Sequence, residues 1–268
     1  MASDISDIDY SSLDRPEVLA FLFHPRPESE NFSTMGNRND VMIPVEDNIK
    51  IGAAFHAAGK SFPTVLFFHG NGEIVSDYDD IGMLYNKMDI NFFPVDYRGY
   101  GKSTGRPTVT AMMRDSHGIF NYVQNWLAKN RYTGPITIMG RSLGSAPALE
   151  IAEQYQNGIS GLIIESGFAY CVPLMNLLGI DVAGLGIDED DVIKNIEKIR
   201  NFGKKTLIIH AEFDHIIPFS DGVALFEECA SSEKEMIEIK DADHNTIFYH
   251  GIKQYMQAVK KFLQGTSL

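Results

Sequence analysis

The sequence has 268 residues, of which 44% are hydrophobic and 22% are charged, and its formal net charge at pH 7 is −13. This length allows one domain with an insertion and a sizeable core, and the composition is that of a soluble globular protein. The strong negative charge argues against nucleic acid and against an anionic membrane surface as main partners.

The sequence shows neither the pattern of a signal peptide nor that of a membrane-spanning helix, and the acidic run at residues 188–191, weighed as a metal site, is interpreted as the acidic first turn of a helix. Met1 to Asp14 are polar and acidic, unlike a signal peptide, and no apolar run approaches the roughly 20 residues that span a bilayer. Cys171 and Cys229 lie far apart and match no metal or redox spacing. We therefore expect a cytoplasmic protein with no stable membrane insertion, free thiols, and no metal or organic cofactor.

Strand and helix patterns alternate along most of the chain. Residues 1–40 are rich in Ser, Asp, Asn and Pro and are interpreted as an N-terminal extension. Residues 41–45 and 51–55 predict a hairpin, and the apolar run 63–68 is typical of a strand covered on both faces. Further strands are expected at 90–95, 136–139, 161–165, 206–210 and 234–239, and helices at 77–88, 109–129, 145–152, 220–229 and in a last stretch that runs to about 264. The pattern predicts an α/β fold with a mostly parallel central sheet of about eight strands, flanked by helices.

The segment Gly140-Arg141-Ser142-Leu143-Gly144 lies between a predicted strand and a predicted helix. A G-x-S-x-G sequence at such a corner forces the serine into a strained backbone conformation and exposes its hydroxyl. The helix that follows offers unpaired N–H groups to a developing oxyanion. Taken alone, the same five residues also fit an ordinary tight turn.

A serine nucleophile needs a base and an acid that holds the base, and both are present in later strand-end loops. We predict His244 as the base and Asp214 as the acid, because their order along the chain, serine, acid, histidine, is that of α/β-hydrolases. Asp214 is preferred because it directly follows a buried strand. The residues weighed against these two are Asp241, Asp243, Glu165 and Glu212 as acids, and His210 and His215 as bases.

The oxyanion hole needs two N–H groups aimed at one point. Leu143 supplies one as the residue after the serine, and Asn71 is predicted to supply the second, with Gly72 as the alternative. His69 is interpreted as a residue that braces this loop. The segment Gly101-Lys102-Ser103 resembles the end of a phosphate-binding loop, but Asp96 stands where that motif needs glycine.

Several strand-end segments together resemble the α/β-hydrolase superfamily over about residues 40 to 265. They are His69-Gly70-Asn71-Gly72, Asp96 to Ser103, Gly140 to Gly144, Asp214 to Pro218, and Asp243-His244. The forms Gly-Arg-Ser-Leu-Gly and Asp-Tyr-Arg-Gly-Tyr-Gly-Lys-Ser are similar to the branch that includes protein depalmitoylases. The resemblance implies Ser142 as nucleophile, Asp214 as acid, His244 as base, and Asn71 with Leu143 as oxyanion donors.

The same resemblance implies a division of the chain into core and cap. Residues 41–167 and 204–268 would form the hydrolase core. Residues 168–203 would form a short helical cap insert, with two helices separated by the glycine-rich stretch 179–186. Its apolar residues either favour an acyl or aromatic substrate group or simply pack the insert onto the core. The residues taken as candidate substrate contacts are Gly72, Arg141, Phe168, Tyr170 and Met175.

The sequence thus predicts a serine hydrolase that cleaves small carboxylic esters or thioesters through an acyl-enzyme. A peptidase or a carbon–carbon bond hydrolase could use the same triad. A ligand-binding protein that has kept the fold without catalysis is the third hypothesis.

Overall fold

A computed structural model describes residue 5 and residues 8–29 and 38–265 of the chain. The rest of the predicted N-terminal extension, at residues 1–4, 6, 7 and 30–37, lies outside the described residues. The chain divides into two compact units, Met1–Thr137 and Ile138–Leu268.

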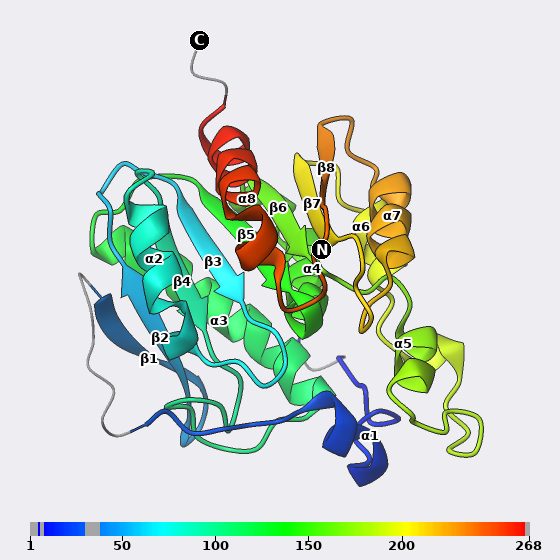
Figure 1. Cartoon of the computed structure of the whole chain (residues 1–268). Coiled ribbons are helices and arrows are strands. Elements are labelled where there is room, and N and C mark those ends of the chain that lie inside the picture. The colour runs from blue at the N-terminus through cyan, green and yellow to red at the C-terminus, as the bar shows by residue number, and fades with distance from the viewer. Residues whose placement is uncertain (1–4, 6–7, 30–37, 266–268) are drawn as a thin grey trace. The chain divides into compact units, whose positions relative to one another are not determined.

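The first unit contains a four-stranded sheet in the order β1-β2-β4-β3 (Figure 1). The pairs β1/β2 and β2/β4 are antiparallel, whereas β3 and β4 are parallel. Its elements are α1 (Pro16–Leu22), β1 (Arg38–Glu46), β2 (Ile49–His56), β3 (Thr64–Phe68), the 3₁₀ turn η2 (Val75–Tyr78), α2 (Asp79–Asn86), β4 (Asn91–Val95) and α3 (Val109–Lys129).

Local chemistry explains where the elements of this unit begin and turn. The hairpin between β1 and β2 turns at Asn48, which has a φ of 64°, a conformation that asparagine tolerates better than most residues. Helix α3 begins after Thr108, whose side chain accepts a hydrogen bond from the main chain of Ala111. Asp14 adds a second cap, because its Oδ1 accepts from the N–H of Val109 at 2.7 Å.

The second unit contains the strands β5, β6, β7 and β8 in that order, and the pairs β6/β7 and β7/β8 are parallel. Helices α7 and α8 contact β7 and β8 (Figure 1). Its elements are β5 (Ile136–Arg141, which starts in the first unit), the 3₁₀ turn η3 (Ser142–Gly144), α4 (Ser145–Gln154), the 3₁₀ turn η4 (Gln156–Gly158), β6 (Gly161–Glu165), α5 (Cys171–Leu177), the 3₁₀ turn η5 (Glu189–Asp191), α6 (Asn195–Arg200), β7 (Thr206–Ala211), α7 (Phe219–Glu228), β8 (Lys234–Ile239) and α8 (Ile247–Gln264).

The central strands are buried along their whole length, as the apolar runs predict. Every residue of β3, β4, β6 and β7 is buried, and each large apolar side chain removed from water contributes about 1.5–3 kcal/mol. Eight strands occur among the described residues. In that same part of the chain, no helix combines the length and hydropathy needed to cross a membrane.

Candidate active site

Ser142 occupies a sharp corner between β5 and α4 in the second unit. Its φ is 51°, in the left-handed region that costs a residue with a Cβ about 1–2 kcal/mol. Gly140 makes the corner possible, because a Cβ built there would lie 2.2 Å from the main-chain oxygen of Gly144. Ser145 tightens the turn by donating its hydroxyl to the carbonyl of Ser142 at 2.7 Å. The corner therefore has the strained geometry that the motif predicts.

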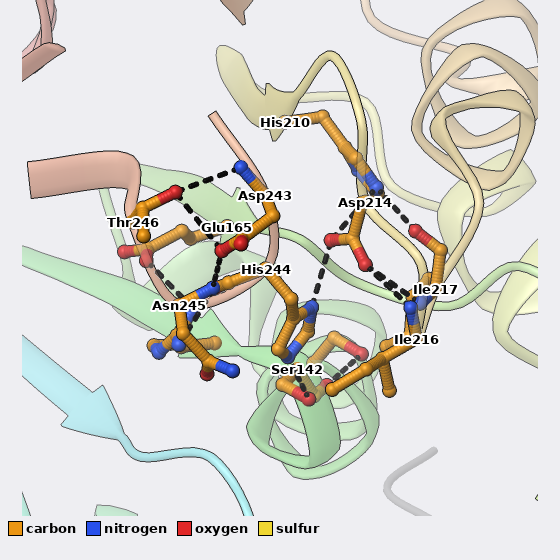
Figure 2. A network of polar contacts seen from close by, with 12 residues as sticks. Ser142, Glu165, His210, Asp214, Ile216, Ile217, Asp243, His244, Asn245 and Thr246 are labelled. Carbon is orange, nitrogen blue, oxygen red and sulfur yellow. Dashed lines mark hydrogen bonds and ion pairs between the residues drawn. The ribbon is translucent and has the colours of Figure 1, made fainter. Parts of the chain in front are cut away.

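A chain of hydrogen bonds joins Ser142, His244 and Asp214 (Figure 2). His244 Nε2 lies 3.0 Å from Ser142 Oγ, and His244 Nδ1 lies 2.7 Å from Asp214 Oδ2. A carboxylate can only accept here, so Nδ1 carries the proton and Nε2 is free to accept the serine proton. The three side chains are thus placed for proton transfer from the serine hydroxyl to the imidazole.

Asp214 is held in the loop between β7 and α7. Its second oxygen, Oδ1, accepts from the N–H groups of Ile216 at 3.0 Å and Ile217 at 2.8 Å. Burial alone would raise the pKa of this carboxyl, but the hydrogen bond and charge of His244 and the Ile217 N–H outweigh it, and the pKa is lowered. Asp214 therefore remains an anion at neutral pH, as a partner for an imidazolium must be.

His210 lies beside Asp214 and is fully buried on β7. Its Nε2 is 2.9 Å from the carbonyl of Ile217 and 3.5 Å from Asp214 Oδ2 (Figure 2). Bonding to the carbonyl places the proton on Nε2, and within the described residues Nδ1 has no hydrogen-bond partner. Burial lowers the pKa of His210, so a neutral ring packs against the acid.

Of the two predicted oxyanion donors, Asn71 belongs to the first unit and Leu143 to the second. Leu143 is the second residue of η3, and in the part of the chain that the structure describes its N–H forms no hydrogen bond. In the first unit, the Asn71 side chain is fully engaged: its Oδ1 accepts from the His24 N–H at 2.8 Å and from the Tyr100 hydroxyl at 2.7 Å, and its Nδ2 lies 2.8 Å from His24 Nδ1.

The loop that carries Asn71 is braced from several directions. His69 Nε2 lies 3.2 Å from Asp96 Oδ1, and the Tyr97 hydroxyl donates to the His69 carbonyl at 2.6 Å. The Gly72 carbonyl accepts from Arg26 Nε at 2.8 Å. Gly72 has a φ of 75° and open space where a Cβ would stand.

The remaining candidate substrate contacts have different surroundings. Phe168 and Met175 are buried in the segment 168–203, with 2% and 0% of their surface exposed, whereas Tyr170 is 49% exposed. Tyr170 lines a cavity of about 260 Å³ between α5 and α6. The guanidinium of Arg141 is buried and donates to Glu165 and to the His244 carbonyl, each at 3.0 Å.

Three of the carboxylates weighed against Asp214, those of Asp243, Glu212 and Glu165, have other partners. Asp243 Oδ1 accepts from the Asn245 N–H at 2.9 Å and so shapes the turn before α8 (Figure 2). Glu212 accepts from the Asp241 N–H at 3.0 Å, and Glu165 binds Arg141. Among the described residues, Asp214 is the carboxylate bonded to His244. In that part of the chain no group of three or more His, Cys, Asp or Glu side chains could hold a metal ion.

Three contributors to these networks were not singled out in the sequence. Tyr255 lies on α8, and its hydroxyl donates to Glu165 Oε2 at 2.7 Å. His24 was placed in the extension, 47 residues before the Asn71 that it binds. Tyr100 belongs to a segment that was recognised, but nothing in its neighbours indicates that it contacts Asn71.

Comparison with known proteins identifies the relatives of this chain. A family described as "Serine aminopeptidase, S33" matches residues 59–179. The chain is 33% identical over 211 residues to α/β hydrolase domain-containing protein 17B of Homo sapiens, covering 75% of this chain and 66% of that protein. Protein 17C of Mus musculus is 30% identical over 225 residues, covering 80% and 64%. The matches thus span less than two thirds of the length of these relatives.

Solved structures confirm the predicted fold. The esterase Pf2001 of Pyrococcus furiosus superposes with a TM-score of 0.73 at 19% identity, covering 90% of this chain and 98% of that one. Est1E of Butyrivibrio proteoclasticus with bound ferulic acid superposes with a TM-score of 0.68 at 19% identity, covering 83% and 97%. By its fold and its sequence relatives, the chain belongs to the α/β-hydrolase superfamily, and it is similar in sequence to the α/β hydrolase domain-containing 17 proteins.

Proposed function

We propose that the protein is a serine hydrolase that cleaves small carboxylic esters or thioesters through an acyl-enzyme, with Ser142, His244 and Asp214 as its catalytic triad. The observation that carries this proposal is the hydrogen-bond chain of 3.0 Å and 2.7 Å that links the serine hydroxyl, the imidazole and the buried carboxylate. A serine hydroxyl is unreactive near neutral pH unless a base takes its proton, and this chain supplies both the base and its anionic support.

In the acylation half of the reaction, Nε2 of His244 first takes and then gives a proton, while Nδ1 stays hydrogen-bonded to Asp214. Ser142 Oγ attacks the carbonyl carbon while Nε2 takes the hydroxyl proton, and the carbonyl electrons move onto oxygen. Asp214, hydrogen-bonded to Nδ1, stabilises the imidazolium that forms when Nε2 is protonated. When the tetrahedral intermediate collapses, the bond to the alcohol or thiol breaks and Nε2 gives its proton to that leaving group.

The negative oxygen of the intermediate needs fixed N–H donors. Leu143 is proposed as the first donor, because it directly follows Ser142 in the turn that leads into α4, and its N–H lacks a partner among the described residues. Asn71 is proposed as the second, because its loop is held in place through its side chain. Water then attacks the acyl group, His244 again takes a proton, and the acid product leaves with Ser142 regenerated.

Labelling with a fluorophosphonate and intact-mass measurement would test this proposal directly. The wild type should gain one adduct, and Ser142→Ala and His244→Ala should gain none. Ser166→Ala is a matched control, because Ser166 is also a buried serine with positive φ at the end of a strand, and it should still be labelled. On an ester substrate Ser142→Ala should lower kcat by roughly 10⁶-fold. A labelled Ser142→Ala variant, or a folded wild type without adduct, would contradict the proposal and favour a ligand-binding role.

A peptidase is the second candidate, favoured by the description of the matching family as a serine aminopeptidase. The same triad can expel an amine if His244 protonates it. Matched p-nitrophenyl esters and aminoacyl p-nitroanilides would separate the two functions. We expect kcat/KM to be higher for the esters, and the reverse order would assign the chain to peptide hydrolysis.

A further inference from the structure

The residue immediately before the proposed nucleophile makes a contact that the proposed mechanism does not use. Arg141 ends β5, and its guanidinium is buried with 7% of the residue exposed. Its Nη1 donates to Glu165 Oε1 and its Nη2 donates to the main-chain carbonyl of His244, both at 3.0 Å. One side chain thus links the end of the strand that precedes Ser142 to the main chain of the proposed base.

Glu165 binds this guanidinium, and Tyr255 in turn binds Glu165. Glu165 ends β6, is 1% exposed, and accepts from the Tyr255 hydroxyl through its other oxygen, Oε2, at 2.7 Å. Tyr255 is 1% exposed and lies on α8, the helix that follows the loop of His244. We call these three residues the Arg141 cluster.

The loop between β8 and α8 is attached on two sides of the site. On the side of the acid, the carbonyl of Ala242 accepts from the Phe213 N–H at 2.9 Å, next to Asp214. On the side of the nucleophile, the carbonyl of His244 accepts from Arg141, next to Ser142. The first hydrogen bond holds the loop of His244 beside Asp214, and the second holds it beside Ser142.

Stability alone does not explain why a buried ion pair stands at this position. Removing an arginine and a glutamate from water is costly, and replacing such a pair with apolar residues of similar volume is often neutral or stabilising. Apolar residues cannot, however, donate a hydrogen bond to the carbonyl of His244. The planar guanidinium, with N–H groups pointing in different directions, can serve that carbonyl and Glu165 together, which a lysine ammonium does far less well.

We propose that Arg141 is a positioning residue for the hydrolysis: it holds the main chain of His244 so that Nε2 stays within hydrogen-bond reach of Ser142 Oγ, while Glu165 and Tyr255 orient its guanidinium. This inference rests on the proposed function of the triad. It assigns to Arg141 an effect on the rate of the chemical step and none on the binding of substrate.

The test separates stability from catalysis by replacing the whole Arg141 cluster with apolar residues. The triple variant Arg141→Met, Glu165→Leu, Tyr255→Phe leaves neither a charge nor a hydroxyl of the cluster behind. We expect its midpoint of thermal unfolding to stay at or above that of the wild type. Its kcat should fall by about 10²-fold, since a displacement of about 1 Å can cost this much, and its KM should stay within about twofold.

A second buried ion pair of the same unit provides the matched control. Nζ of Lys198 on α6 lies 2.6 Å from Oε2 of Glu150 on α4, and the two side chains are 8% and 7% exposed. The double variant Lys198→Met, Glu150→Leu should keep kcat within about twofold of the wild type. A loss of kcat in this control equal to that of the triple variant would show a general effect of removing buried charge and would overturn the proposal.

The remaining outcomes are equally decisive. A folded triple variant with the kcat of the wild type, or with a changed KM alone, overturns the positioning role. Should the triple variant not fold, Arg141→Lys decides the question: we expect about a tenfold fall in kcat at constant KM, and an unchanged kcat overturns the proposal. A wild type that neither turns over esters nor takes a fluorophosphonate overturns the proposed function itself, and the positioning role with it.

Discussion

Replacing Asp214 by asparagine should inactivate the site without unfolding it, for a reason visible in the hydrogen bonds. Asparagine has the shape of aspartate, but one of its oxygens becomes an amide nitrogen that can only donate. The Oδ1 position faces the N–H groups of Ile216 and Ile217, so the amide oxygen must remain there. The new NH₂ group then faces Nδ1 of His244.

This orientation reverses the tautomer of the imidazole. Nδ1 must accept from the amide, so the ring proton moves to Nε2, which lies 3.0 Å from Ser142 Oγ. A protonated Nε2 cannot take the serine proton. We expect kcat to fall by about 10⁴-fold, as in serine hydrolases with the same exchange, which corresponds to about 5.4 kcal/mol of transition-state stabilisation.

Steady-state kinetics on a p-nitrophenyl ester, with thermal unfolding measured in parallel, would check this expectation. Asp243→Asn is the matched control, because Asp243 is one residue from His244 and its Oδ1 accepts from the Asn245 N–H and the Thr246 hydroxyl, which an amide oxygen can also do. Its kcat should stay within about twofold. If Asp214→Asn kept more than a tenth of the wild-type kcat, or if Asp243→Asn lost as much, the assignment of the acid would be wrong.

Two further predictions concern stability. Gly140→Ala should lower the free energy of unfolding by about 1–3 kcal/mol, because the new Cβ would lie 2.2 Å from the main-chain oxygen of Gly144. Gly203→Ala is the control, since a Cβ at Gly203 meets no atom closer than 3.9 Å. Equal urea midpoints for the two variants would contradict this prediction. Burial lowers the pKa of His210 below its ordinary value of 6.5. As the pH falls, the imidazole is therefore protonated at a higher pH in the unfolded chain than in the folded one. The free energy of unfolding then decreases as the pH drops below 6.5, by at most about 1.4 kcal/mol per pH unit. His210→Gln should lose less stability than the wild type between pH 7.5 and 5.5 in urea titrations, and an equal loss would refute the expectation.

The elements and the fold class could be predicted because they depend on local periodicity. The fully apolar runs at β3 and β7 and the spacing of apolar residues in α3 indicate their state without knowledge of their partners. Ends were less predictable: β1 begins at Arg38 rather than at residue 41, because pairing with His56 of β2 extends the ladder past the apolar residues.

The triad could be proposed from sequence because parallel strands bring their carboxyl ends to one edge, which joins Ser142 and His244 across 102 residues. The Arg141 cluster could not be proposed in the same way. Whether an arginine beside a nucleophile faces solvent or turns inward depends on which acceptors pack around it, and those acceptors come from β6 and from the loop before α8. Nothing in the residues that flank Tyr255 on α8 marks it as the hydrogen-bond donor to Glu165.

The hydrogen bonds that hold the Asn71 side chain restrict the transfer of its loop to another protein. The hydrogen bonds that hold its side chain come from His24, 47 residues earlier, and from Tyr100, 29 residues later. Since such contacts form only after long loops have closed, the loop acquires its shape as part of the folded unit. A chimera that received His69 to Gly72 alone would carry the motif without the restraints that orient it. Transplanting this loop as a working part requires His24 and Tyr100 to move with it.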